Sequence, residues 1–169
     1  MIKLFVMTSL RFVSFLIVFI LLSTFAIESF ASNLKVKKML ADFIYKVPSH
    51  FKASGEGTKL CLFGYDETVA LIDREYDNVV LLDLEKDSSV SDCKLVYVAQ
   101  DKTRTIRDVL DGFYEAKIPT ISFNDNFIES GGMMHVSIGR RSIELAVNKE
   151  RVKGASVVFD PLMSSILVN

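Results

Sequence analysis

The two cysteines, Cys61 and Cys93, are the side chains in this sequence with the widest range of chemistry. A cysteine pair can form a disulfide, act as a thiolate nucleophile or contribute to a metal site. An even number of cysteines in an exported chain favours a disulfide, whereas two buried free thiols are the default in the cytosol. We expect a bond here, and closing its loop would stabilise the fold by roughly 3–4 kcal/mol in the chain-entropy treatment.

The first residues predict export. Lys3 and Arg11 are the early cations, and an uncharged apolar run follows from Phe12 to Ile27. With small residues at both ends of 29–31, this is the pattern of a secretory signal peptide, so we expect segment 1–31 to be cleaved off. The alternative is an uncleaved N-terminal anchor, although the run is shorter than the roughly 20 residues that a bilayer core requires. Either way the remainder is expected outside the cytoplasm, most simply in a bacterial periplasm.

Polar side chains gather where three of the expected strands end. The ends of parallel strands meet at one edge, which is where open α/β sheets bind ligands. The residues concerned are Tyr65, Asp66, Gln100, Asn124 and Asp125. They form a candidate small-molecule site, although polar residues also end strands in proteins that bind nothing there.

Catalytic and metal-binding patterns are weak. His50 follows a proline in a loop, and His135 falls on an alternating strand, where it is expected to face solvent. A metal site needs clustered ligands, and Gly64 lacks the further glycines of a phosphate loop. Arg140 and Arg141, at the tip of an expected hairpin, are either a solvated turn or a contact for an acidic partner. We therefore predict no metal, no cofactor and no enzymatic activity.

The elements that position these residues alternate between strands and helices. The expected strands are short apolar runs, and the expected helices carry apolar residues three or four positions apart. In chain order we predict a helix at 34–47, a strand at 59–64, a helix at 67–76, strands at 78–84 and 93–99, a helix at 103–116 and a strand at 118–123. Such strands are typical of the α/β class, with a mainly parallel sheet and helices on both faces. The first and third strands then become neighbours, with both cysteines at one edge.

Towards the C-terminus the pattern changes to a period of two. Alternation at 134–138 and 143–147 predicts an antiparallel hairpin, with Gly139 at the first position of a type II′ turn. Asn148 is expected to cap a short helix that Gly154 stops. A last helix is expected from Asp160–Pro161 to about Leu167.

Length and charge limit the remaining possibilities. Residues 32–169 have the length of a single domain with one hydrophobic core. The whole chain has a formal net charge of −1, and loss of segment 1–31 makes the rest slightly more acidic. Without a basic field, the protein is not expected to bind nucleic acid.

Several short segments, taken in order, resemble the YfiR family of periplasmic proteins over essentially the whole exported region. They are a helix ending in a proline at 43–48, LCLFG at 60–64, CKLVYV at 93–98, IPTIS at 118–122, the pair Gly131–Gly132, IELAVN at 143–148 and RVKGA at 151–155. The sequence departs from the family at Val47, where tryptophan is usual before the proline. It departs again after the glycines, where Met133, Met134 and His135 stand in place of the more common Arg and Phe.

The resemblance implies a non-enzymatic regulator. Members of the family are periplasmic inhibitors that bind the sensing domain of an inner-membrane diguanylate cyclase, hold cyclic-di-GMP synthesis down and so restrain biofilm growth. A structural Cys61–Cys93 disulfide and a homodimer are implied as well, and a related sensor such as a histidine kinase is an alternative target. From the residues alone, the rival hypothesis is a small periplasmic solute-binding protein that uses the carboxyl ends of the strands.

Overall fold

The structure, a computed structural model, describes residues 34–53, 57–82, 90–99, 106–139, 142–161, 163 and 167–168. The expected signal segment 1–31, Gln100 and the arginines of the hairpin tip lie outside these ranges. Contacts divide the chain into two units, Met1–Met39 and Leu40–Asn169. In the first unit residues 34–39 are helical. No helix within the described ranges is both long enough and apolar enough to span a bilayer.

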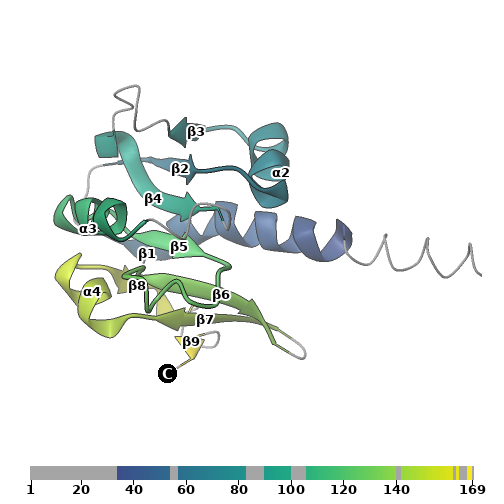
Figure 1. The fold of residues 1–169 in the computed structure, drawn as a ribbon. Helices are drawn as coiled ribbons and strands as arrows, with labels where there is room; N and C mark the ends of the chain where they lie inside the picture. The colour runs from purple at the N-terminus through teal and green to yellow at the C-terminus, as the bar shows by residue number, and fades with distance from the viewer. Residues whose placement is uncertain are drawn as a thin grey trace, which may run out of the picture. The chain divides into compact units, whose positions relative to one another are not determined.

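A seven-stranded sheet is the centre of the second unit, with the strand order β3-β2-β4-β5-β6-β7-β9 (Figure 1). The strands are β2 (Lys59–Phe63), β3 (Val79–Leu82), β4 (Cys93–Val98), β5 (Thr120–Ser122), β6 (Met134–Ile138), β7 (Ile143–Val147) and β9 (Leu167–Val168). Every neighbouring pair is parallel except β6 and β7. The predicted adjacency of the two cysteine strands, β2 and β4, is confirmed.

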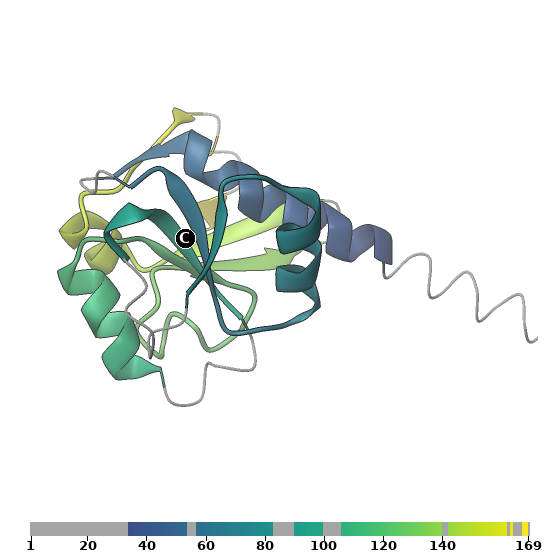
Figure 2. The same ribbon diagram turned by 90° about the horizontal axis from the view of Figure 1, so that it is seen from above.

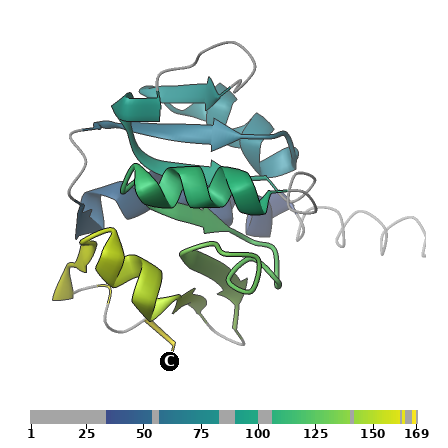
Figure 3. The same ribbon diagram turned by 60° about the vertical axis from the view of Figure 1, so that its left-hand side comes forward.

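Helices cover both faces of this sheet, as predicted. On one face lie α3 (Arg107–Glu115) and α4 (Lys149–Gly154), and on the other lie α2 (Glu67–Glu75) and the helical residues 40–46 (Figures 2 and 3). The chain leaves residues 40–46 through a short 3-10 helix, η1 (Val47–His50), which contains Pro48. A second 3-10 helix, η2 (Val90–Asp92), leads into β4. The mainly parallel α/β architecture of the prediction is therefore the observed one.

The core on the α3 face follows from the spacing of apolar residues. Ile106, Leu110 and Phe113 lie on one side of α3 and are at most 3% exposed. They pack against buried residues of the strands and of the following turn, in a cluster that comprises Cys61, Leu82, Cys93, Val96, Val98, Ile106, Leu110, Phe113, Ile118 and Phe127. The Phe113 ring also contacts Phe63 edge-on, with 6.2 Å between centroids. Burying side chains of this size contributes about 1.5–3 kcal/mol each.

The predicted hairpin is present as β6 and β7, paired from Met134↔Val147 to Ile138↔Ile143. Gly139 differs from the prediction, because its N–H donates to Ser142 O at 2.8 Å. Gly139 therefore precedes the turn and does not occupy its first position; Arg140 and Arg141 lie outside the described ranges.

The last predicted helix is wrong. Val158–Phe159 form β8, which pairs antiparallel with β1 (Phe51–Lys52) in a separate two-stranded sheet. Leu167–Val168 form β9 beside β7. After Asp160, Met163 N donates a hydrogen bond of 2.9 Å to Asp160 O. At 167–168 the edge of β7 pairs with the chain, and this tertiary contact overrides the local preference for a helix that reaches Leu167.

The short helix α4 begins as predicted but ends later. Asn148 Oδ1 accepts a hydrogen bond of 3.2 Å from Arg151 N, which caps the first turn. The last helical residue is Gly154, and Ala155 is the C-cap. Ser156 follows with a positive φ of 56°, and Val157 N then donates to Val152 O at 3.0 Å. Gly154 is thus the last residue of the helix and not the residue that stops it after Lys153. A Cβ at Gly154 would overlap the Tyr114 hydroxyl of α3, so close packing explains this glycine.

Candidate functional site

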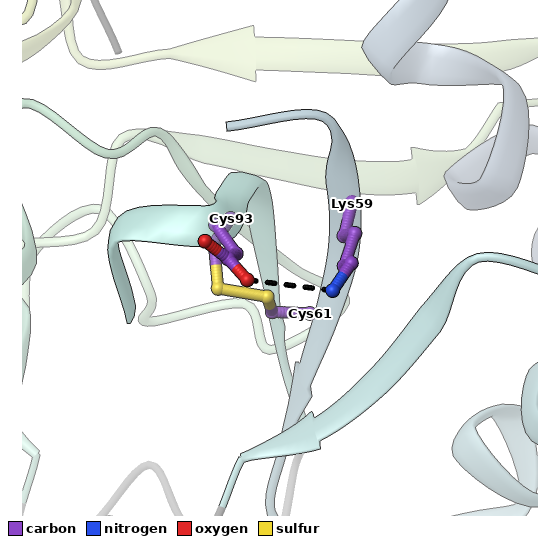
Figure 4. The surroundings of a disulfide bond; sticks show 4 residues. Lys59, Cys61 and Cys93 are labelled. Carbon is purple, nitrogen blue, oxygen red and sulfur yellow. Dashed lines mark hydrogen bonds and ion pairs between the residues drawn. A yellow bond between two sulfur atoms is a disulfide. The ribbon is translucent and has the colours of Figure 1, made fainter. Parts of the chain in front are cut away.

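The predicted disulfide joins the amino ends of β2 and β4 (Figure 4). The Cα atoms of Cys61 and Cys93 are 5.6 Å apart, and the two residues are 0% and 2% exposed. No cysteine of the chain is a free thiol. The bond therefore lies inside the core cluster beneath α3 and links two strands that another strand, β3, separates along the chain.

A bulge in β4 makes this bond geometrically feasible. Lys59 is opposite Cys93, but the next residue, Leu60, is opposite Leu95, so Lys94 is the extra residue of the bulge. Side chains alternate between the faces of a strand. In a regular strand Cys93 and Val96, three residues apart, would point to opposite faces; the bulge places Cys93 on the face of Val96 and Cys61.

The loop before β2 packs closely against the same point. A Cβ at Gly57 would overlap the backbone carbonyl of Cys93, and Thr58 N donates to Asp92 O at 3.0 Å. Beside the disulfide, Lys59 Nζ is 3.3 Å from Asp92 Oδ2 (Figure 4). Both side chains of this ion pair are largely exposed, so it contributes about 1 kcal/mol at most.

Asp66, a candidate ligand residue, is used by the fold. Its Oδ1 accepts a hydrogen bond of 2.8 Å from Val69 N, which caps α2, and its Oδ2 accepts one of 2.7 Å from the Tyr97 hydroxyl. Tyr65, the preceding residue, is 65% exposed. The contacts of Asp66 with Val69 and Tyr97 favour a structural role for this carboxylate.

Asn124 and Asp125 belong to a turn that follows β5. Asn124 Oδ1 accepts from Asn126 N at 2.9 Å, and Asn124 N donates to the buried Ser122 Oγ at 3.2 Å. The Asp125 side chain is 94% exposed, with Oδ1 3.5 Å from His135 Nε2. Asp66 thus contacts the start of α2 and β4, whereas Asn124 and Asp125 contact their own turn and His135. None of Tyr65, Asp66, Asn124 and Asp125 lines the three hollows near β1 and the starts of β2 and β4.

His135 does not face solvent as predicted, because its side chain is only 14% exposed. It lies opposite Ser122 of β5 and Ala146 of β7. The turn that starts at Asn124 covers this part of the sheet, with the fully buried Phe127 in the core cluster. Alternation along β6 is correct, but the second face of the strand is covered as well. Among the described residues, no group of three His, Cys, Asp or Glu could hold a metal ion.

Arg151 is a residue that the sequence analysis did not single out. Its guanidinium forms an ion pair with Asp111 of α3 and lies 4.9 Å from the centre of the Tyr114 ring. A Cβ at Gly131, which has a φ of +102°, would lie 3.3 Å from Arg151 Cζ. Arg151 therefore holds α4, α3 and the glycine pair together. The only signal in the sequence was its place in the RVKGA segment.

Three hollows near the amino ends of β2 and β4 were also missed. Their volumes are about 340, 410 and 290 Å³. They adjoin, since the first two share Phe51 and Lys52 and the last two share Thr58 and Lys94. The first hollow lies between β1 and β8, whose pairing no local pattern predicts.

The comparison with known proteins agrees with the resemblance in the sequence. The profile of the family described as YfiR/HmsC-like matches residues 38–165. No curated protein matches the sequence at a significant level. The matched region contains both cysteines, the whole hairpin and Arg151, and it covers most of the chain. The protein belongs to the YfiR/HmsC-like family.

Proposed function

We propose that this protein is a periplasmic regulatory binding protein that inhibits an inner-membrane sensor, first of all a diguanylate cyclase, and so lowers cyclic-di-GMP signalling. The observation that carries the proposal is the family match across residues 38–165. The predicted signal segment and the paired cysteines support an oxidising compartment.

The positions of the family-like segments support a role in binding. The segments at 60–64 and 93–98 are the two cysteine strands, and the segment at 151–155 holds α4 on α3 through Arg151. These family-like segments stabilise the fold, so in this proposal the exposed residues outside them determine which partner is bound. In this proposal the Cys61–Cys93 bond keeps the inhibitor folded outside the cytoplasm.

The test is capture of the sensor from solubilised inner membranes, with the oxidised, exported protein as bait. Recovery of a membrane-anchored diguanylate cyclase is the expected result, and the Cys61→Ser/Cys93→Ser variant should recover much less. Deleting the gene should raise cellular cyclic-di-GMP, and the intact gene supplied in trans should restore it. An unchanged cyclic-di-GMP level in the deletion strain would contradict the proposal, whereas recovery of a histidine kinase would redirect it to that sensor.

A homodimer is part of the proposal. Light scattering of the oxidised protein at several concentrations should give twice the monomer mass. A monomer mass at every concentration, including that of the capture experiment, would remove the dimer from the proposal and leave the inhibitory role in place.

A further inference from the structure

The three adjoining hollows form one concave surface, which we call the amino-edge surface and define by Lys46, His50, Phe51, Lys52, Thr58 and Lys94. It lies at the amino ends of β2 and β4, the opposite edge of the sheet from the candidate ligand residues at the strands' carboxyl ends. Its residues come from η1 and its flanks, from β1 and from the starts of the two cysteine strands.

The charge of this surface is one-sided. Three lysines and His50 line the hollows, against the single carboxylate of Asp160. Among the described residues, none of Lys46, Lys52 and Lys94 has a carboxylate within ion-pair distance, whereas Lys59 is paired with Asp92 and Arg151 with Asp111. The chain as a whole is slightly acidic. The positive charge of this cluster therefore contrasts with the slightly negative net charge of the whole chain.

The surface also has an apolar floor. Phe51 is 4% exposed, and its ring contacts Phe159 edge-on with 6.4 Å between centroids. Lys94, the extra residue of the bulge, places its ammonium group 5.9 Å from the centre of the Phe51 ring. Val158, at the rim of the first hollow, is 66% exposed. Apolar side chains beside these cations suit a ligand that combines carboxylates with an apolar side chain.

We infer that the amino-edge surface docks an acidic segment of the partner protein, with carboxylates placed at Lys46, Lys52 and Lys94 and an apolar side chain near Phe51 and Val158. This inference rests on the proposed function for the existence of a protein partner. The hollows favour a polypeptide segment over an anionic bilayer, because the side chains of a segment can enter a hollow and the flat surface of a bilayer cannot follow it. Complementary charge of this kind raises the association rate and selects the partner.

The bulge gives the surface a structural link to the disulfide. Lys94 follows Cys93 directly and is itself the extra residue of the bulge that places Cys93 on the face of Cys61. Lys94 also lines two of the hollows. The bond therefore fixes the backbone from which one of the three docking lysines projects.

The test uses the oxidised, exported protein and, as probe, a fluorescein-labelled peptide of alternating Glu and Leu. The variant Lys46→Glu/Lys52→Glu/Lys94→Glu is compared with the control Lys117→Glu/Lys149→Glu/Lys153→Glu, which makes the same charge change at exposed positions elsewhere. The amino-edge variant should bind about tenfold more weakly or worse, because it removes favourable charge contacts and adds repulsive ones, and the control should bind like the parent. Binding should also weaken between about 0.15 M and about 1 M salt, as the screening length falls from about 8 Å to about 3 Å.

Three results would overturn the inference. They are equal peptide affinity in both variants, equal binding of a matched Lys–Leu peptide, and binding of phosphatidylglycerol vesicles but not of the peptide. A Lys52→Glu single variant, at an exposed position, repeats the comparison if the triple variant loses its disulfide or its cooperative unfolding. In the membrane capture experiment, loss of the sensor with the amino-edge variant but not with the control supports the inference. If the parent captures no sensor, the proposed function fails, while the peptide titration still decides whether the surface binds acidic segments.

Discussion

The Tyr97 hydroxyl donates a hydrogen bond of 2.7 Å to Asp66 Oδ2, across 31 residues of sequence. Tyr97 is in β4 and is 0% exposed, while Asp66 caps α2 through Val69 N. A single carboxylate therefore connects the first turn of α2 to the strand that carries Cys93. The bond is partly buried, and hydrogen bonds away from water are electrostatically stronger than in water.

Replacing Asp66 should consequently destabilise the fold. Asp66→Ala removes the helix cap and the bond to Tyr97, so we expect the free energy of unfolding in urea to fall by about 1–3 kcal/mol. Tyr97→Phe should cost about 1 kcal/mol, and the double variant less than the sum of the two. If the Asp66→Ala protein is as stable as the parent, the structural role is contradicted, and a ligand-binding role for the Asp66 carboxylate is favoured instead.

Breaking the disulfide should have a larger effect. The bond closes a loop with a sequence separation of 32 residues. Loss of that constraint on the unfolded chain is expected to lower the free energy of unfolding by roughly 3–4 kcal/mol. Urea denaturation of the parent with and without reductant measures this, and the Cys61→Ser/Cys93→Ser variant should be insensitive to reductant. A parent whose midpoint does not move on complete reduction would contradict the expectation.

Two helical glycines should respond in opposite ways to alanine. A methyl group added at Gly112 in α3 would have nothing within 4 Å, so Gly112→Ala should raise the free energy of unfolding by about 1 kcal/mol through helix propensity. At Gly154 the same methyl group overlaps the Tyr114 hydroxyl, and Arg151 holds that ring in place. Gly154→Ala should therefore lower the free energy of unfolding by about 1–3 kcal/mol. Thermal denaturation of the pair distinguishes packing from propensity, and equal shifts would contradict the packing argument.

Lys117 offers a stabilising substitution. It ends α3 with a φ of 59°, and Ile118 N donates to Phe113 O at 2.9 Å, which is the hydrogen bonding of a Schellman motif. A left-handed conformation costs an L-residue about 1–2 kcal/mol, part of which glycine recovers. In urea denaturation, Lys117→Gly should raise the free energy of unfolding by about 0.5–1 kcal/mol. Lys117→Ala, which keeps the Cβ, should give no such gain.

The elements that the sequence predicts well are those that local patterns determine. Ile106, Leu110 and Phe113 give α3 one buried side, and the apolar runs at β2 and β4 give the two central strands. The adjacency of these strands follows from the usual winding of parallel sheets, which is why the cysteine pairing could be expected from the order of elements along the chain.

What the sequence did not predict depends on contacts between distant segments. At 167–168 the chain extends the sheet beside β7, because the edge of β7 supplies backbone partners that a local helix signal cannot anticipate. Alternation placed His135 opposite the buried residues of β6, but it carries no information on whether a turn covers the other face. Likewise, Asp66 has the residue type of a ligand, and its use by the fold becomes evident only from its contacts with Val69 and Tyr97 in the structure.

The bulge at Lys94 makes formation of the Cys61–Cys93 disulfide depend on how β4 pairs with β2. If β4 keeps the pairing of Val96 with Cys61 but forms without the bulge, the Cys93 thiol points to the opposite side of the sheet from Cys61. The two thiols of such a molecule are then out of reach of each other, and the Cys61–Cys93 bond does not form. The disulfide therefore forms only in molecules in which β2 and β4 have paired in the native alignment, and it stabilises those molecules selectively.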